Sequence, residues 1–93
     1  MNTKPLAKFL GCLFLPSVDE KGYFMVEVIR GKNNTRPPSS FYFNSQGKIA
    51  DIENKGFFNQ KYISLIISFL EANKILFQHE LLKQNKEILY KEN

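Results

Sequence analysis

The chain has 93 residues, of which 43% are hydrophobic and 24% are charged. This length and composition predict one globular domain, residues 1–93, with a modest core, and they exclude a disordered chain. Thirteen Lys and Arg against nine Asp and Glu give a net charge of +4, a surplus that only mildly favours a polyanionic partner.

Cys12 is the only cysteine and His79 the only histidine. An intramolecular disulfide is therefore excluded, and a zinc site would lack its usual ligands. We expect Cys12, which has apolar neighbours, to be a small buried residue. His79 has no partner set for a catalytic triad, and the scattered carboxylates have none for acid–base work. We predict no metal, no cofactor and no enzymatic activity.

The first apolar run, FLGCLFL (Phe9–Leu15), follows two lysines and has the outline of a secretory signal. It stops at Pro16 without a small-residue cleavage site, so we exclude that interpretation. No segment approaches the roughly 20 apolar residues of a membrane span. A cytoplasmic protein that does not contact a membrane is therefore expected.

Four strands are predicted in the first part of the chain. They are expected at Phe9–Leu15, Tyr23–Arg30, Ser40–Asn44 and Ile49–Glu53. The first is apolar on both alternations, which is typical of a central strand. In the second, Phe24, Val26 and Val28 share the buried face. Turn residues in Pro16–Gly22 and Asn44–Lys48 connect these strands.

A basic loop rich in Asn and Pro, KNNTRPP, follows the second strand. Its cations and amides could hold phosphates, with exposed tyrosines stacking on bases. The other interpretation is a solvated hairpin connection whose prolines end the strand pairing. The candidate contacts for a polyanion or a protein partner are Arg30, Lys32, Asn33, Asn34, Arg36, Tyr23 and Tyr42.

Two helices are predicted over about residues 59–86, the first with Asn59 as its N-cap. Its apolar stripe consists of Tyr62, Ile63, Leu65, Ile66, Ile67, Phe69 and Leu70. Asn73 is expected to end or bend it. The second helix uses Phe77, Leu81 and Leu82, and the segment after it ends in a short strand or frays. The predicted class is α+β: an antiparallel sheet of about four strands followed by two helices on one face.

The chain contains the stretches GYFMVEV, SSFYFNSQGKIADI, NQKYISLIISFLEANK and HELLKQNKEI. Together these four stretches resemble a family of small bacterial domains of unknown function, often encoded in toxin–antitoxin-like operons. Tyr23 and Met25 stand where that family has a His-Phe-His motif, and Phe69 stands in place of a Trp. The resemblance implies an α+β fold, and the role of the family's histidines does not carry over.

The leading functional hypothesis is a small non-catalytic protein-interaction module, antitoxin-like or an accessory of a mobile element. Its motivation is the apolar character of both faces of the first strand, because two helices cover only one face of a sheet. One face carries Phe9, Leu13 and Leu15 and the other Leu10, Cys12 and Phe14, and whichever face the helices leave uncovered would meet a partner or a second copy of the chain. The alternative is a nucleic-acid-binding protein that uses the basic loop Arg30–Arg36.

Overall fold

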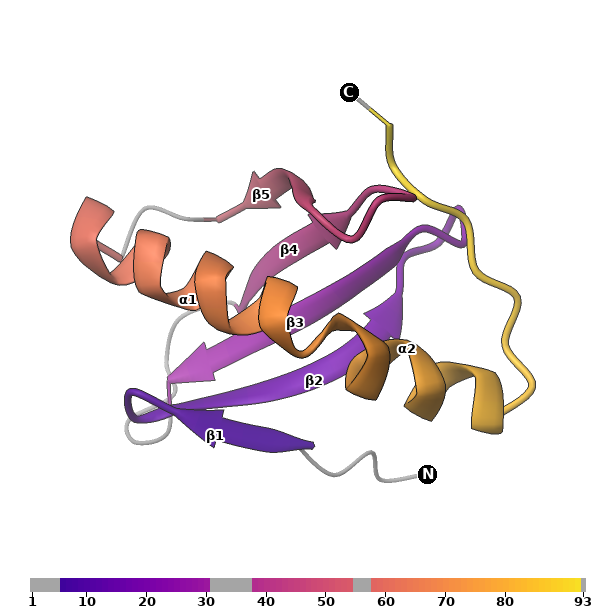
Figure 1. Cartoon of the computed structure of the whole chain (residues 1–93), viewed down its shortest axis with the longest axis horizontal. Helices are drawn as coiled ribbons and strands as arrows, with labels where there is room; N and C mark the ends of the chain where they lie inside the picture. The colour runs from indigo at the N-terminus through magenta and orange to yellow at the C-terminus, as the bar shows by residue number, and fades with distance from the viewer. Residues whose placement is uncertain (1–5, 31–37, 55–57, 93) are drawn as a thin grey trace.

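The sheet is a meander of five antiparallel strands in the order β1-β2-β3-β4-β5 (Figure 1). The strands are β1 (Ala7–Phe9), β2 (Cys12–Val18), β3 (Phe24–Arg30), β4 (Ser39–Phe43) and β5 (Ile49–Glu53). The computed structural model describes residues 6–30, 38–54 and 58–92. Two helices follow the sheet, so the predicted α+β class is confirmed, with five strands where about four were expected.

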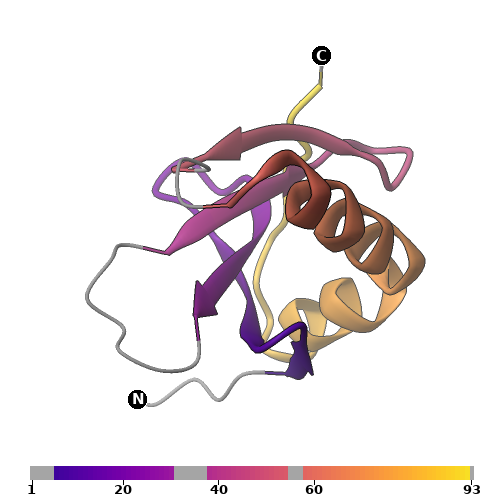
Figure 2. The same cartoon turned by 90° about the vertical axis from the view of Figure 1, so that its left-hand side faces the viewer.

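Helices α1 (Gln60–Ala72) and α2 (Lys74–Lys83) lie on the same side of the sheet (Figure 2). The predicted N-cap is confirmed, because the Asn59 side chain accepts a hydrogen bond from the backbone N–H of Tyr62 at 2.9 Å. Asn73 separates the helices, and its side chain donates to the Phe69 carbonyl at 2.8 Å. Neither helix in the described part of the chain is long and apolar enough to cross a membrane.

The core lies between the helices and one face of the sheet, and aromatic rings fill much of it. The Phe24 and Phe43 rings stack with centroids 4.8 Å apart. The Phe14 ring is fully buried and meets Phe69 at 4.9 Å and Phe77 at 6.4 Å. The expected inward positions Phe24, Val26 and Val28 are completely buried, and Cys12 is 4% exposed, as predicted. Large rings give this short chain much buried apolar area from few residues.

The apolar run Phe9–Leu15 is not one central strand, which corrects the prediction. Leu10 and Gly11 have φ values of 53° and 72°, as type I′ hairpin turns require. The chain therefore reverses there, with β1 as the edge strand and Phe9 paired with Cys12. Phe9 consequently lies on the helix side, stacked on Phe69 at 4.4 Å, and not with Leu13 and Leu15.

The predicted turn at Pro16 is also wrong, because β2 continues to Val18. β1 pairs with β2 only as far as Phe14, so Pro16 lies on a free edge of β2. A proline without an N–H is tolerated at such an edge. The turn itself begins at Asp19, whose backbone N–H donates to the Tyr23 carbonyl at 3.1 Å.

Three residues of the predicted helical stripes are exposed instead of buried. In α1 the buried line is Ile63, Ile66 and Leu70. Tyr62 and Leu65 each precede a residue of this line, and one residue turns an α-helix by about 100°. Their side chains therefore point away from the core and are 45% and 40% exposed. In α2, Leu82 is one residue beyond buried Leu81, and 52% of it faces solvent.

The segment after α2 returns along the end of the sheet (Figure 1). Leu89 forms a parallel bridge with Tyr23. Its N–H donates to the Gly22 carbonyl at 2.9 Å, and its carbonyl accepts from the N–H of Phe24 at 2.8 Å. Farther on, the N–H of Lys91 donates to the Phe43 carbonyl at 3.0 Å. Of the two predicted alternatives, this segment is therefore bound to the sheet and not frayed.

Candidate binding surface on the open sheet face

The two faces of the sheet have different environments. Side chains alternate along each strand, so residues neighbouring the buried Phe14, Val26 and Phe41 point away from the helices. No helix of the described chain covers this second side, which we call the open face (Figure 2). The strand register places on it Lys8, Leu13, Leu15, Ser17, Met25, Glu27, Ile29, Ser40, Tyr42, Asp51 and Glu53.

One end of the open face is apolar. Leu13 pairs directly with Ile29, and Leu15 lies two residues farther along β2. All three side chains are half-buried although neither α1 nor α2, the helices of the described residues, lies over them. Polar residues commonly occupy a sheet face that meets only water. The apolar end is therefore a surface suited to contact with another molecule.

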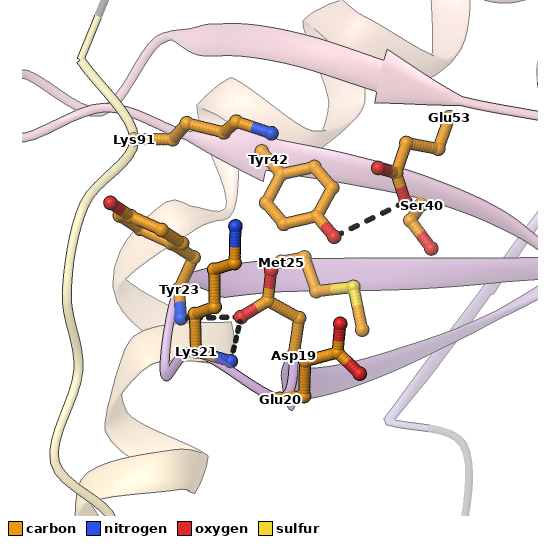
Figure 3. A pocket seen from close by; sticks show the side chains of 9 residues that line it. All are labelled: Asp19, Glu20, Lys21, Tyr23, Met25, Ser40, Tyr42, Glu53 and Lys91. Carbon is orange, nitrogen blue, oxygen red and sulfur yellow. Dashed lines mark hydrogen bonds between the residues drawn. The ribbon is translucent and has the colours of Figure 1, made fainter.

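The other end of the open face contains a hollow of about 490 Å³ (Figure 3). Its floor is formed by Met25 and Tyr42, paired across β3 and β4, which are 8% and 3% exposed. The residues that line it are Asp19, Glu20, Lys21, Tyr23, Met25, Ser40, Tyr42, Glu53 and Lys91. Three carboxylates thus surround an aromatic floor, with two lysines on the same walls.

The Tyr42 hydroxyl lies among carboxylates and donates to Glu53 Oε1 at 3.3 Å. Burial raises the pKa of this phenol, and the negative charges of Glu53 and Asp19 raise it further. Tyr42 therefore stays a neutral hydrogen-bond donor across the physiological pH range.

The Lys91 side chain reaches the hollow from the C-terminal segment (Figure 3). Its ammonium lies 4.4 Å from the centroid of the Tyr42 ring and 2.9 Å from Oδ2 of Asp51. This combines a cation–π contact with an ion pair. The hydrogen bond to Asp51 raises the pKa of Lys91, and the charges of Asp51, Glu53 and Asp19 add to the effect. A positive charge at this point is thus stabilised by three carboxylates.

Asp19 shapes the wall of the hollow formed by the β2–β3 turn. Its carboxylate accepts from the backbone N–H groups of Lys21 and Tyr23, each at 2.9 Å. Burial alone would raise the pKa of this carboxyl. The backbone hydrogen bonds from Tyr23 and Lys21 outweigh that effect, and the pKa lies below its usual value.

The lowered pKa of Asp19 leads to a prediction for pH dependence. A carboxyl whose pKa is lower in the folded chain stabilises the fold above its unfolded pKa and loses this effect as pH falls through the folded one. Asp19→Asn keeps an oxygen acceptor without charge and is expected to cost on the order of 1 kcal/mol at pH 7. In urea unfolding, the difference from the wild type should shrink below about pH 4. A difference in unfolding free energy between wild type and Asp19→Asn that stays constant from pH 7 to pH 2.5 would contradict this prediction.

The predicted contact residues fall into three groups. Tyr23 and Tyr42 both line the hollow, but Tyr42 is buried and not exposed, because it lies in the middle of β4 beneath the Lys91 ammonium. Arg30 is exposed at the end of β3, in register with Cys12. Lys32, Asn33, Asn34 and Arg36 lie outside the described residues. The polyanion contact of this set stays a prediction.

Sequence reasoning missed most of the hollow, including Asp19, Glu53 and Lys91. Asp19 had a detectable signal. An Asp at the start of a turn, here shortly before Gly22, often accepts hydrogen bonds from backbone N–H groups of the residues that follow it. The position of Lys91 had none, because Asp51 lies 40 residues earlier in the chain. Within the described ranges, no group of three or more His, Cys, Asp or Glu side chains is arranged to hold a metal ion.

Comparison with known proteins leaves the open face as the main guide to function. No family model, no curated protein and no solved structure matches this chain. The resemblance to domains of toxin–antitoxin-like operons therefore stays a prediction from the stretches that carry it.

Proposed function

We propose that this chain is a non-catalytic module that binds another protein through the open face of its sheet. The observation that carries the proposal is the apolar end of that face, where neither helix of the described chain covers Leu13, Leu15 and Ile29. Protein interfaces commonly combine such an apolar centre with a polar rim. Glu27, in register with Leu15, and the charged hollow would form that rim.

The electrostatics of the open face favour a protein over a nucleic acid as its partner. The hollow has three carboxylates against two lysines among its lining residues. Phosphate-binding surfaces are instead rich in Lys and Arg. Tyr42, which could stack on a base, is a buried residue, 3% exposed.

The environment of Asp19 supports binding more than acid–base catalysis by this carboxyl. A general acid needs a raised pKa, so that it holds a proton near neutral pH. The pKa of Asp19 is shifted in the opposite direction. An antitoxin-like or mobile-element accessory role would be one use of such a module, with a partner encoded beside it.

The proposal is tested by comparing two matched variants in affinity capture. Leu15→Glu places a carboxylate at the apolar end, and Leu65→Glu places the same group on exposed α1, away from the sheet. Tagged wild type and variants would be incubated with a lysate of the native host, and bound proteins quantified by mass spectrometry. We expect a stoichiometric protein whose recovery falls at least about tenfold with Leu15→Glu, as for loss of 1.4 kcal/mol or more, and not with Leu65→Glu.

Two results would overturn the proposal. One is equal recovery of every bound protein by both variants when circular dichroism shows both to be folded. The other is an eluate rich in nucleic acid, by its 260/280 nm absorbance ratio, without a stoichiometric protein. That result would favour the basic loop Arg30–Arg36, and binding should then weaken steeply with salt and on Arg36→Ala.

A further inference from the structure

The hollow on the open face already holds one cation, which belongs to the chain itself. The Lys91 ammonium contacts the Tyr42 ring at 4.4 Å and Asp51 at 2.9 Å. Aromatic faces flanked by carboxylates bind alkylammonium and guanidinium groups in many proteins. The position of Lys91 thus demonstrates that this surface accepts a positively charged side chain.

Two carboxylates that line the hollow, Glu53 and Glu20, are exposed. Glu53 accepts a long hydrogen bond, 3.3 Å, from Tyr42, and it is exposed. Glu20, on the opposite wall, is exposed as well. A guanidinium group carries five N–H donors in a planar fork and pairs with carboxylates in two-point contacts. The volume of about 490 Å³ is large enough to admit such a group.

We propose that the hollow formed by Tyr42, Met25, Asp19 and Glu53 receives an arginine or lysine side chain of the protein partner, in competition with Lys91. This inference rests on the proposed function, because it names the chemistry by which that partner is recognised. The apolar end would supply contact area. The hollow would add selectivity for a basic residue next to an apolar segment.

Competition with Lys91 has a measurable consequence. A site that an intrachain group occupies for part of the time binds an external ligand more weakly, in proportion to the unoccupied fraction. Lys91→Met removes the charge and keeps a long apolar side chain. Because exposed ion pairs contribute little stability, this variant should fold and bind a basic ligand about two- to fivefold more tightly.

The test is an NMR titration of the full chain with two short peptides. Acetyl-Gly-Arg-Gly-amide carries the guanidinium, and the same peptide with citrulline in place of arginine has nearly the same shape without charge. We expect the arginine peptide, with a Kd on the order of millimolar, to shift the Met25 methyl and Tyr42 ring signals. The citrulline peptide should leave these signals unchanged.

Two charge-neutralising variants locate the effect. Glu53→Gln removes a carboxylate from the hollow and should weaken binding several-fold. Glu80→Gln makes the same change on α2, where Glu80 pairs with Lys83, and should leave binding unaltered. The inference is overturned if both peptides shift the signals equally, or if neither shifts them in the wild type and in Lys91→Met.

This outcome is separable from that of the proposed function. If Leu15→Glu loses the captured protein but the arginine peptide does not bind, the inference about a basic side chain is wrong and the proposed interaction surface still holds. Arginine binding with unaltered capture by Leu15→Glu would overturn the proposed function while retaining the cation site.

Discussion

Replacing Phe14 with alanine is expected to lower the free energy of unfolding by about 3–5 kcal/mol, the usual cost of deleting a buried aromatic ring. Phe14 is fully buried on β2. Its ring meets Phe69 of α1 at 4.9 Å and Phe77 of α2 at 6.4 Å. One side chain thus joins the sheet to both helices. Its removal would leave a cavity lined by rigid aromatic rings, which cannot easily move in to fill it.

The measurement is urea unfolding followed by circular dichroism. Leu82→Ala is the control, because Leu82 is 52% exposed and its truncation should change stability by no more than about 0.5 kcal/mol. Phe14→Leu keeps most of the volume and should give a smaller loss than Phe14→Ala. A Phe14→Ala variant as stable as Leu82→Ala would show that the helices are attached to the sheet by other contacts.

Strict alternation made part of the sheet predictable. Phe24, Val26 and Val28 recur every second residue, as do Phe41 and Phe43, and all five side chains are completely buried. A period of two leaves only one way to bury such a set on a sheet. The start of α1 was predictable for a similarly local reason, since Asn59 precedes the apolar period and its side chain caps the helix.

The N-terminal hairpin was not predictable in this way. In Phe9–Leu15 every residue except Gly11 is apolar, so no alternation marks a reversal. The first turn residue is Leu10, with φ of 53°, a conformation that leucine seldom adopts. The pairing of β1 with β2 compensates for this local cost. Tertiary contacts therefore decide the structure here, against the local preference.

The hollow was even less predictable from the sequence. Its floor could be anticipated, because Met25 and Tyr42 occupy the alternation opposite to the buried phenylalanines. Its walls could not, since Asp19, Glu53 and Lys91 come from a turn, an edge strand and the C-terminal segment. The bridge between Leu89 and Tyr23 and the hydrogen bond from the Lys91 N–H to the Phe43 carbonyl bring Lys91 to the sheet. Such isolated contacts have no periodic pattern that would reveal them.

Ending the chain after Lys86 is expected to lower the free energy of unfolding by about 3 kcal/mol. Three backbone hydrogen bonds to Gly22, Phe24 and Phe43 would be lost, each contributing about 1 kcal/mol. The packing of Ile88 and Tyr90 on the core would be lost as well. Fewer ordered residues would offset part of this cost. Thermal or urea unfolding of the shortened chain measures the difference.

A pair of substitutions at Leu89 separates the backbone bonds from the side chains. Leu89→Pro removes the N–H that donates to the Gly22 carbonyl and should destabilise by about 1–3 kcal/mol. Leu89→Ala keeps that N–H, and because Leu89 is 53% exposed it should cost less than about 1 kcal/mol. Equal effects would mean that the segment is held by its side chains. A large loss of stability with Leu89→Pro, together with an unchanged stability of Lys91→Met, would show that the backbone bridge and not the Lys91 side chain anchors the segment. The Lys91 ammonium could then leave the Tyr42 ring for a partner's side chain without detaching the segment.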